Sequence, residues 1–320
     1  MSYEFNALQA QGTWSLVSPP SNHQIIGCKW IFKIKRLADS SIAHHKARLV
    51  AQGYKQEYGI DYLETFIPVV KFPTIRFFLT VALHYNWQVF QLDVVNAFLH
   101  GNIDKTIYMS QPPGFADPQL PNHVCLLRKA IYGLKQSPRL WFATLTSYLS
   151  SQNFQVSSAD PSFLLLSKNN IIVYIFIYVD DILITDNNSS FISSLITNLH
   201  NKFQIRNLGP LSRFLGIDFT RTSTGFHLTQ NSYIQELLNI ASMTNCKPIQ
   251  TPLPNKFPTD PSLQQPFAQP ALFRQIIGSL QYLSSVRPDI AFVFNKFFQQ
   301  MHKPLLLHYQ LLKRVLRYLC

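Results

Sequence analysis

The stretch IIVYIFIYVDDILI, residues 171–184, places two adjacent aspartates between a nine-residue apolar run and a three-residue one. Two unpaired carboxylates in such surroundings would lose the solvation that their charges need, and each would raise the pKa of the other. A β-hairpin with the pair Asp180–Asp181 at its tip avoids this loss if the pair binds a Mg²⁺ ion. The alternative is an exposed acidic turn, since Asp is common in turns. The apolar flanks on both sides favour the metal site.

A third carboxylate is expected at the end of another core strand, because one ligand pair seldom holds a metal alone. Asp93 meets this expectation, since it follows the apolar-rich segment Val89–Leu92. Taken by itself, Asp93 could equally be the N-cap of a helix. Together with Asp180 and Asp181 it predicts a two-metal phosphoryl-transfer centre, in which one ion activates an attacking hydroxyl and the other holds a triphosphate.

The composition fits a large globular protein that meets a polyanion. The chain has 320 residues, 47% of them hydrophobic, and a formal net charge of +12. A protein this basic commonly binds a nucleic acid or an anionic membrane, although the charge could serve solubility alone. The four cysteines lie far apart without a CxxC pair, which argues against a zinc site or a disulfide framework and favours a reducing compartment.

No segment is predicted to cross a membrane. The N-terminus, MSYEFNALQAQGTW, has neither a basic region nor an apolar core and does not resemble a signal peptide. The most apolar run, residues 171–179, has nine residues where a membrane span needs about 20. A cytoplasmic protein is therefore expected.

Helical and strand patterns are mixed irregularly along the chain, which predicts an α+β fold rather than a regular βαβ sheet. Neither GxGxxG nor GxxxxGK[ST] is present, which argues against dinucleotide and P-loop sites. The segment 251–270 contains six prolines and is the candidate domain boundary. The basic helical ending after it could follow a phosphate backbone or be a solvated helix face. The expected elements are strands at 30–35, 47–51 and 89–94, a turn at 39–41, a proline-rich loop at 111–121, and helices at 74–87, 140–149, 191–203, 271–283, 290–301 and 308–319.

Several ordered blocks of the sequence resemble one family. QLDVVNAF (91–98), YGLKQSPRLW (132–141) and YVDD (178–181) have the order and spacing of reverse transcriptases. The longer stretches KWIFKIK (29–35), KARLVAQGYKQEYGIDYLETFIPVVK (46–71), IYMSQPPGF (107–115), NLGPLSRFLGIDF (207–219) and GSLQYLSSVRPDI (278–290) closely resemble the copia-type (pseudoviral) LTR retrotransposons. The resemblance runs from about Trp14 to the C-terminus, nearly the whole chain.

The resemblance implies a right-hand polymerase fold with fingers, palm and thumb. It divides the chain into a short N-terminal lead (1–13), the fingers, palm and start of the thumb (14–255), and a helical thumb or connection extension (256–320). The chain stops at RYLC, before RNase H carboxylates, so a fragment or a decayed genomic copy is expected. It departs from the family pattern at Asp39–Ser40, at His44–His45 and at Arg206.

The resemblance also implies a role for each site residue. Asp93, Asp180 and Asp181 would be catalytic and would hold two Mg²⁺ ions, which Mn²⁺ could replace, with the Val94 carbonyl as a further ligand. Phe98 would exclude a 2′-OH beneath the incoming sugar, although a lone Phe is also common in ordinary core packing. The implied nucleotide-binding residues are Lys33, Lys35, Arg48, Phe98, Gly133, Lys135 and Gln136, with the choice between the first two lysines open. The implied primer grip is Phe214, Leu215 and Gly216.

The function implied is that of an RNA-directed DNA polymerase that adds dNTPs to the primer 3′ end of a template-primer duplex. Other domains of a Pol polyprotein, integrase and RNase H, would be its partners, in the cytoplasmic virus-like particle of an intact element. The first alternative is a retrotransposon relic that only binds nucleic acid. The second is a structural protein that does neither.

Overall fold

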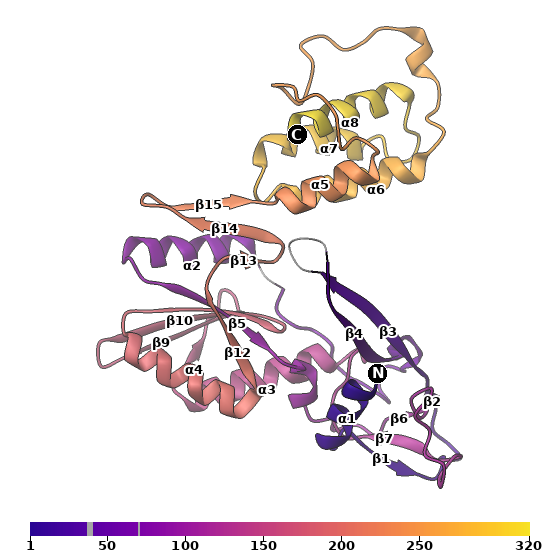
Figure 1. Ribbon diagram of the computed structural model, residues 1–320, viewed down its shortest axis with the longest axis vertical. Coiled ribbons are helices and arrows are strands. Elements are labelled where there is room, and N and C mark those ends of the chain that lie inside the picture. Colours follow the sequence, from indigo (N-terminus) through magenta and orange to yellow (C-terminus); the bar gives the residue numbers. More distant parts are fainter. Residues whose placement is uncertain (37–40, 70) are drawn as a thin grey trace. The chain divides into compact units, whose positions relative to one another are not determined.

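The structure is a computed structural model that describes the backbone of residues 1–36, 41–69 and 71–320, and their side chains except those of residues 35, 36, 43 and 44. The chain forms two compact units, residues 1–210 (unit 1) and 211–320 (unit 2) (Figure 1). The turn predicted at 39–41 lies outside the described residues except for Ser41. Among the described residues, no helix is long and apolar enough to span a bilayer.

A six-stranded antiparallel sheet forms the centre of unit 1. Its strands, in spatial order, are β12 (Ile205–Pro210), β5 (Val89–Val94), β11 (Asp181–Asp186), β10 (Ile171–Tyr178), β9 (Phe163–Lys168) and β8 (Gln155–Val156). The predicted hairpin is confirmed as β10–β11. Its register pairs Tyr178 with Asp181, so the tip consists of Val179 and Asp180. The predicted tip, Asp180–Asp181, was therefore wrong by one residue.

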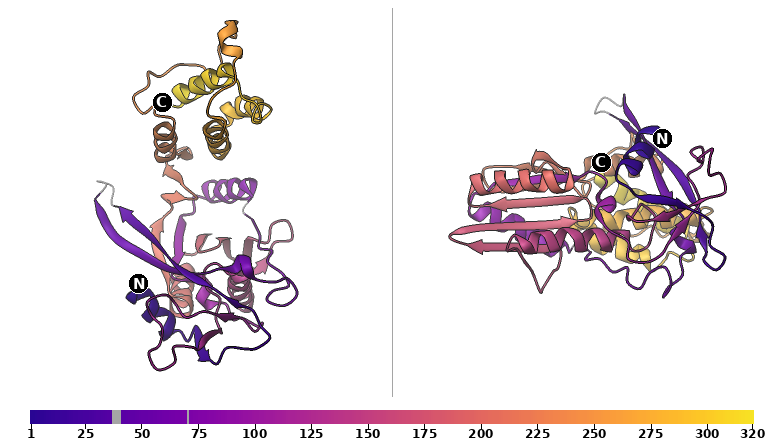
Figure 2. Two further views of the ribbon diagram at one scale, coloured as in Figure 1. Left: turned by 90° about the vertical axis from the view of Figure 1, so that its right-hand side faces the viewer. Right: turned by 90° about the horizontal axis from the view of Figure 1, so that it is seen from below.

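Helices cover both faces of this sheet (Figure 1; Figure 2, left). On one face, α3 (Ser137–Ser151) and α4 (Ser189–Phe203) form a core with the sheet that buries Leu92, Ile182 and Ile184. On the other face lies α2 (Phe72–His84), whose Phe78 ring lies 6.4 Å from that of Phe176. This helix was predicted to reach residue 87, but Asn86 has a φ of +55° and the helical backbone ends before it.

The remainder of unit 1 contains a second sheet, a two-stranded ribbon and the N-terminal helix. That helix, α1 (Ser2–Ala10), lies in the segment predicted as a short lead and buries Leu8 in a core with Trp14. The sheet order is β1 (Trp14–Val17), β7 (Val124–Leu127), β6 (Tyr108–Met109), β2 (Ile25–Ile26), and the ribbon pairs β3 (Cys28–Arg36) with β4 (Ile42–Ala51). Short 3₁₀ helices occur at η1 (Gly53–Lys55) and η2 (Ala97–His100).

Unit 2 joins a small sheet to a helical core. Its elements are β13 (Arg213–Phe214), β14 (Ile217–Arg221), β15 (Phe226–Thr229), α5 (Asn231–Ile240), η3 (Pro261–Gln264), α6 (Pro270–Leu283), η4 (Pro288–Ile290), α7 (Ala291–Phe298) and α8 (Leu306–Leu319). The three predicted C-terminal helices are confirmed as α6, α7 and α8. The proline-rich segment 251–270 packs Leu253 and Phe267 against the helical core. The two units divide at 210/211, whereas the subdomain limits at 13/14 and 255/256 stay predictions.

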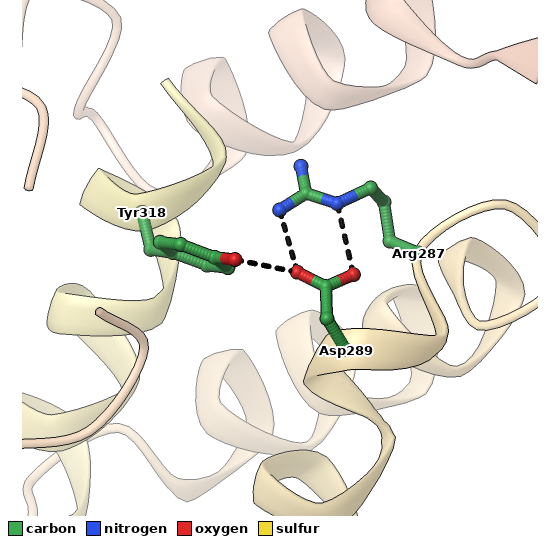
Figure 3. A network of polar contacts seen from close by, with 3 residues as sticks. All are labelled: Arg287, Asp289 and Tyr318. Carbon is green, nitrogen blue, oxygen red and sulfur yellow. Dashed lines mark hydrogen bonds and ion pairs between the residues drawn. The ribbon is translucent and has the colours of Figure 1, made fainter. Parts of the chain in front are cut away.

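A polar network joins α8 to the segment before α7 (Figure 3). The guanidinium of Arg287 donates through Nε and Nη2 to the two carboxylate oxygens of Asp289, at 3.0 and 2.8 Å. The hydroxyl of Tyr318 donates to the same carboxylate at 2.7 Å, and its ring centroid lies 5.0 Å from the Arg287 guanidinium carbon. These bonds, chiefly those from Arg287, hold the pKa of Asp289 below its ordinary value.

Replacing this carboxylate should destabilise unit 2. We expect Asp289→Asn to lower the free energy of unfolding by about 1 kcal/mol at neutral pH, because the partly exposed ion pair is lost. The folded-state pKa is lowered, so the wild-type advantage is present above the unfolded pKa of about 4 and is lost as pH falls through the folded value. Urea unfolding at several pH values measures this difference. Tyr318→Phe, which removes a single hydrogen bond, should cost less, and a pH-independent difference for Asp289→Asn would contradict the assignment.

Candidate active site

The three predicted aspartates come together at one end of the central sheet. Asp181, the first residue of β11, lies directly opposite Asp93 of β5, so the two side chains share a face of the sheet. The backbone N–H of Val94 donates to the carbonyl of Asp180 at 2.9 Å, which ties the hairpin turn to β5. On the other side of β5, Arg206 of β12 lies opposite Asp93. Strand pairing thus gathers acids that are about 90 positions apart in the sequence.

The pKa values of two of these carboxyls rise at this site. Burial raises the pKa of Asp181 to about 6, with Asp180 and Asp93 adding to the rise and a hydrogen bond with Gln91 opposing it. Burial, followed by the charge of Asp180, also raises the pKa of Asp93, and Arg206 opposes that rise. The negative charges therefore repel and destabilise one another, and a cation bound among them would offset this repulsion.

Hard carboxylate oxygens suit Mg²⁺ by their chemistry. However, within the described part of the chain no group of three or more His, Cys, Asp or Glu side chains is close enough to hold a metal ion. The carboxylate of Asp181 also has a hydrogen bond with Gln91. The donor type thus fits a divalent ion, while the roles of Asp93, Asp180, Asp181 and Val94 as metal ligands stay predictions.

The turn that carries Asp180 has a constrained backbone. Val179 has a φ of +52°, a conformation that β-branched residues rarely adopt. The indole N–H of the fully buried Trp141, on α3, donates to the Val179 carbonyl at 2.6 Å. Trp141 holds the Val179 carbonyl and the N–H of Val94 holds the Asp180 carbonyl, so these two bonds restrain both turn residues.

A cavity of about 300 Å³ in unit 1 lies beside the acids. Asp93, Val94 and Asp180 belong to its wall, but Asp181 does not. The other lining residues come from α1, β4, β12 and the segment after β5: Met1, Tyr3, Glu4, His45, Lys46, Ala47, Arg48, Val95, Asn96 and Arg206. The cavity thus places basic side chains next to carboxylates, which suits an anionic ligand that carries a metal ion.

Arg48 is the basic residue that best fits an anionic ligand. Its guanidinium carbon lies 4.2 Å from the ring centroid of Tyr132, which fixes the cation by a cation–π contact. In the described part of the chain, its buried Nε has no hydrogen-bond partner. A buried donor without an acceptor costs free energy that a phosphate oxygen could recover. The role of Arg48 in binding phosphate stays a prediction.

The lysines of β3 lie on the same ribbon as Arg48. Lys33 is directly opposite Lys46, so the two share a face with Arg48, and Lys33 is exposed. The side chain of Lys35 is outside the described residues. The choice between these two lysines therefore stays open, and both stay predictions.

Phe98 packs against the core of the sheet and against Tyr132, with ring centroids 4.7 Å apart. It is half-buried and does not line the cavity. The Tyr132 ring also contacts the guanidinium of Arg48. Tyr132 therefore contacts both Phe98, predicted to contact the sugar, and Arg48, predicted to bind phosphate. The role of Phe98 as a barrier to the 2′-OH stays a prediction.

The YGLKQSP block is fixed by contacts within unit 1. Gly133 has a φ of +92°, and a Cβ there would lie 2.1 Å from the Ala51 carbonyl oxygen, so this glycine permits close packing on β4. Lys135 donates from Nζ to the Tyr62 hydroxyl at 3.0 Å. Gln136 is only 5% exposed and is bonded to Gln56. Close packing at Gly133 and hydrogen bonds at Lys135 and Gln136 account for the positions of these residues without a bound ligand. Their predicted contacts with the nucleotide are untested.

In unit 2, the predicted primer grip forms a tight hairpin turn. Leu215 and Gly216 have φ values of +50° and +68° and connect β13 to β14, while Phe214 is buried. The hydroxyl of Tyr282, on α6, donates to the Leu215 carbonyl, and its ring lies edge-on to that of Tyr233. The turn is therefore fastened to the helical core. A role in holding the primer stays a prediction.

Sequence reasoning missed several residues of the site. Tyr132 lies in the block YGLKQSPRLW, yet no role was predicted for it. Lys46, two residues before Arg48 on the same strand, was also given no role. Arg206 was noted only as a departure from a pattern, and Glu4 was given no role. The alternation of β4 could have indicated Lys46. The other three depend on which segments pack together, which no local pattern reports.

Carboxylates at the end of two paired strands, next to a cavity with basic side chains, have the chemistry that two-metal phosphoryl-transfer sites use. Residues 11–255 match the protein family described as reverse transcriptase (RNA-dependent DNA polymerase). The chain belongs to this family, in the branch of the copia-type retrotransposon Pol polyproteins, and the predicted α+β right-hand polymerase class is confirmed.

Three of the curated relatives are Pol polyproteins of plant transposons. The chain is 46% identical over 320 residues to the retrovirus-related Pol polyprotein from transposon RE1 of Arabidopsis thaliana, with all of this chain and 22% of that protein covered. To the corresponding polyprotein from transposon RE2 of the same plant it is 45% identical, with 100% of this chain and 22% of that protein covered. To the polyprotein from transposon TNT 1-94 of Nicotiana tabacum it is 38% identical, with 100% of this chain and 25% of that protein covered. The chain thus spans about a quarter or less of the length of these relatives.

The hydrogen bond that holds the Val179–Asp180 turn can be tested by Trp141→Phe. This change leaves the Val179 carbonyl without its donor and reduces a buried ring, so we expect the free energy of unfolding to fall by about 2 kcal/mol or more. Primer extension per folded molecule, the activity expected of a member of this family, should fall as well, because Asp180 loses its support. Guanidinium unfolding and primer extension measure the two effects. Trp87→Phe, before the other end of β5, is the control, and a loss of stability without a loss of activity would refute the positioning role.

Proposed function

We propose that this chain is an RNA-directed DNA polymerase that adds dNTPs to a primer 3′ end by two-metal nucleotidyl transfer. The observation that carries the proposal is the pairing of β5 with β11, which sets Asp93 and Asp181 opposite each other and brings Asp180 to the same cavity as Arg48. Carboxylates that repel one another beside a basic wall suit a metal-bound triphosphate better than a neutral ligand.

Asp93 and Asp180 would be the principal metal ligands, because both line the cavity. Asp181, bonded with Gln91, would support them from the sheet, and the Val94 carbonyl would be a further ligand. Two Mg²⁺ ions, which Mn²⁺ could replace, would supply positive charge that activates the primer hydroxyl and stabilises the departing pyrophosphate.

The nucleotide would be held mainly by its triphosphate. Arg48 and Lys46 would donate to phosphate oxygens from β4, with Lys33 or Lys35 adding charge from β3. Tyr132 would hold Arg48 in place, and Phe98 would restrict the sugar. Gly133, Lys135 and Gln136 would shape the pocket from the neighbouring loop.

The larger partner would be an RNA or DNA template-primer duplex, with Phe214, Leu215 and Gly216 holding the primer. The net charge of +12 supports this partner, and binding should weaken steeply as salt rises. Because the relatives are Pol polyproteins, integrase and RNase H domains are proposed as further partners, in the cytoplasmic virus-like particle of an intact element.

The catalytic proposal is tested by Asp180→Asn. Removing a charge that holds the metal should reduce primer extension on an RNA template by about 100-fold or more, which corresponds to roughly 3 kcal/mol of transition-state stabilisation. The measurement is dNTP incorporation with Mg²⁺. Asp104→Asn, an exposed acid of the same unit, should retain activity. Equal incorporation by wild type and Asp180→Asn would remove Asp180 from the mechanism.

The sugar contact is tested by Phe98→Ala. If the ring restricts the 2′ position, discrimination between dNTPs and ribonucleotides should fall by about ten-fold or more. Competition between the two substrates in primer extension measures this ratio, with Phe98→Tyr as the variant that keeps the ring. Unchanged discrimination in folded Phe98→Ala would leave the residue with core packing alone.

Nucleic-acid binding without nucleotide addition is the second candidate. The observation in its favour is that the acids do not form a ready three-ligand cluster among the described residues. Duplex binding without extension in either Mg²⁺ or Mn²⁺ would support this function over the first.

A further inference from the structure

The N-terminal helix brings a buried acid into the cavity. Glu4 of α1 lines the cavity together with Asp93, Asp180, Lys46 and Arg48, and its side chain is only 8% exposed. A carboxylate is rarely buried unless it is paired or serves a site. No step of the proposed nucleotidyl transfer uses Glu4, so its burial requires another explanation.

Packing holds Glu4 in this position. The next residue, Phe5, stacks on Phe115 with ring centroids 4.5 Å apart, and Leu8, one turn later, is buried in the core beside Trp14. The helix also packs against β4, the strand that carries Lys46 and Arg48. The acid therefore stands on an anchored helix rather than on a free end.

Three cations act on Glu4: those of Arg48 and Lys46, which belong to the proposed triphosphate subsite, and the N-terminal ammonium. Burial raises the pKa of the Glu4 carboxyl, and Arg48 and then Lys46 oppose the rise, so both cations act on it electrostatically. Among the described residues, however, no ion pair within 4.0 Å joins Glu4 to Arg48. Glu4 thus balances the cations through space, while the contact that fixes Arg48 is the face of Tyr132.

We propose that Glu4 is a charge-balancing residue of the nucleotide site, which opposes the incoming triphosphate and so limits its affinity. This inference rests on the proposed function. In the free protein the carboxylate offsets part of the charge of Lys46 and Arg48. When a triphosphate takes these cations as partners, the same carboxylate repels it, and partly buried charges are only weakly screened.

The repulsion acts on the bound nucleotide before and during reaction alike. A uniform effect of this kind changes KM and leaves kcat nearly unaltered. A purely structural role for Glu4 predicts the reverse, a loss of folded protein with an unchanged KM. An orienting role, in which Glu4 holds Arg48 in place, predicts a higher KM when the charge is removed.

The test is Glu4→Gln, which keeps the shape of the side chain and removes its charge. We expect the KM for dNTP in primer extension to fall roughly five-fold, the low end of ordinary coupling between sites, with kcat nearly unchanged. Glu4→Asp, which keeps the charge, should lie close to wild type. Glu57→Gln, an exposed acid of the same unit, is the matched control and should leave KM unaltered.

A second measurement makes the test independent of turnover. Inorganic tripolyphosphate, titrated calorimetrically into the full chain, should bind roughly five-fold more tightly to Glu4→Gln than to wild type. Unaltered or weaker tripolyphosphate binding by folded Glu4→Gln, or a KM that stays the same or rises, would overturn the inference. If wild type extends no primer but the tripolyphosphate difference is found, the proposed polymerase activity fails and the charge balance at Glu4 stands.

Discussion

The antiparallel pairing of β5 with β11 is the interaction on which the site depends. It sets Asp181 opposite Asp93, and the bond from the Val94 N–H to the Asp180 carbonyl brings the hairpin turn to the same place. Repulsion among the carboxylates works against this pairing. It is tolerated because the opposite face of the same strands buries Leu92 and Ile182 against α3 and α4, each worth about 1.5–3 kcal/mol on burial.

Charge balance organises the space beside these strands. Arg206 on β12 and the cations of β4 offset the acids of the sheet, and Glu4 adds a further negative charge from α1. Tyr132 belongs both to this charged region and to the packed core, because its ring contacts the guanidinium of Arg48 and the ring of Phe98. Burial raises the pKa of its hydroxyl to about 12, so the ring remains neutral beside the charged groups.

Much of the fold could be predicted from local patterns. The hairpin at 171–184, the strand at 89–94 and the helices α2, α3, α4, α6, α7 and α8 follow from apolar periodicity, which is a local property of the chain. The helices α1 and α5 were not predicted. The differences arose where a few residues decided the outcome. The hairpin tip moved by one residue because the register pairs Tyr178 with Asp181, and α2 ended early because Asn86 adopts a left-handed backbone. Strand register and the sign of φ depend on neighbouring strands and turns, which apolar periodicity does not report.

The sequence by itself determined the acids of the site and the family. Two aspartates inside an apolar hairpin, and a third after an apolar strand, conflict so strongly with burial that they imply a shared cationic partner. Only the tertiary structure decided what surrounds them. Glu4, Tyr132 and Arg206 are ordinary residues in their own segments. Glu4 and Arg206 reach the cavity because α1 and β12 pack there, and Tyr132, from the loop after β7, contacts Arg48 of its wall. Contacts between distant segments arise from the packing of the whole chain, and for that reason no local pattern could have named these residues.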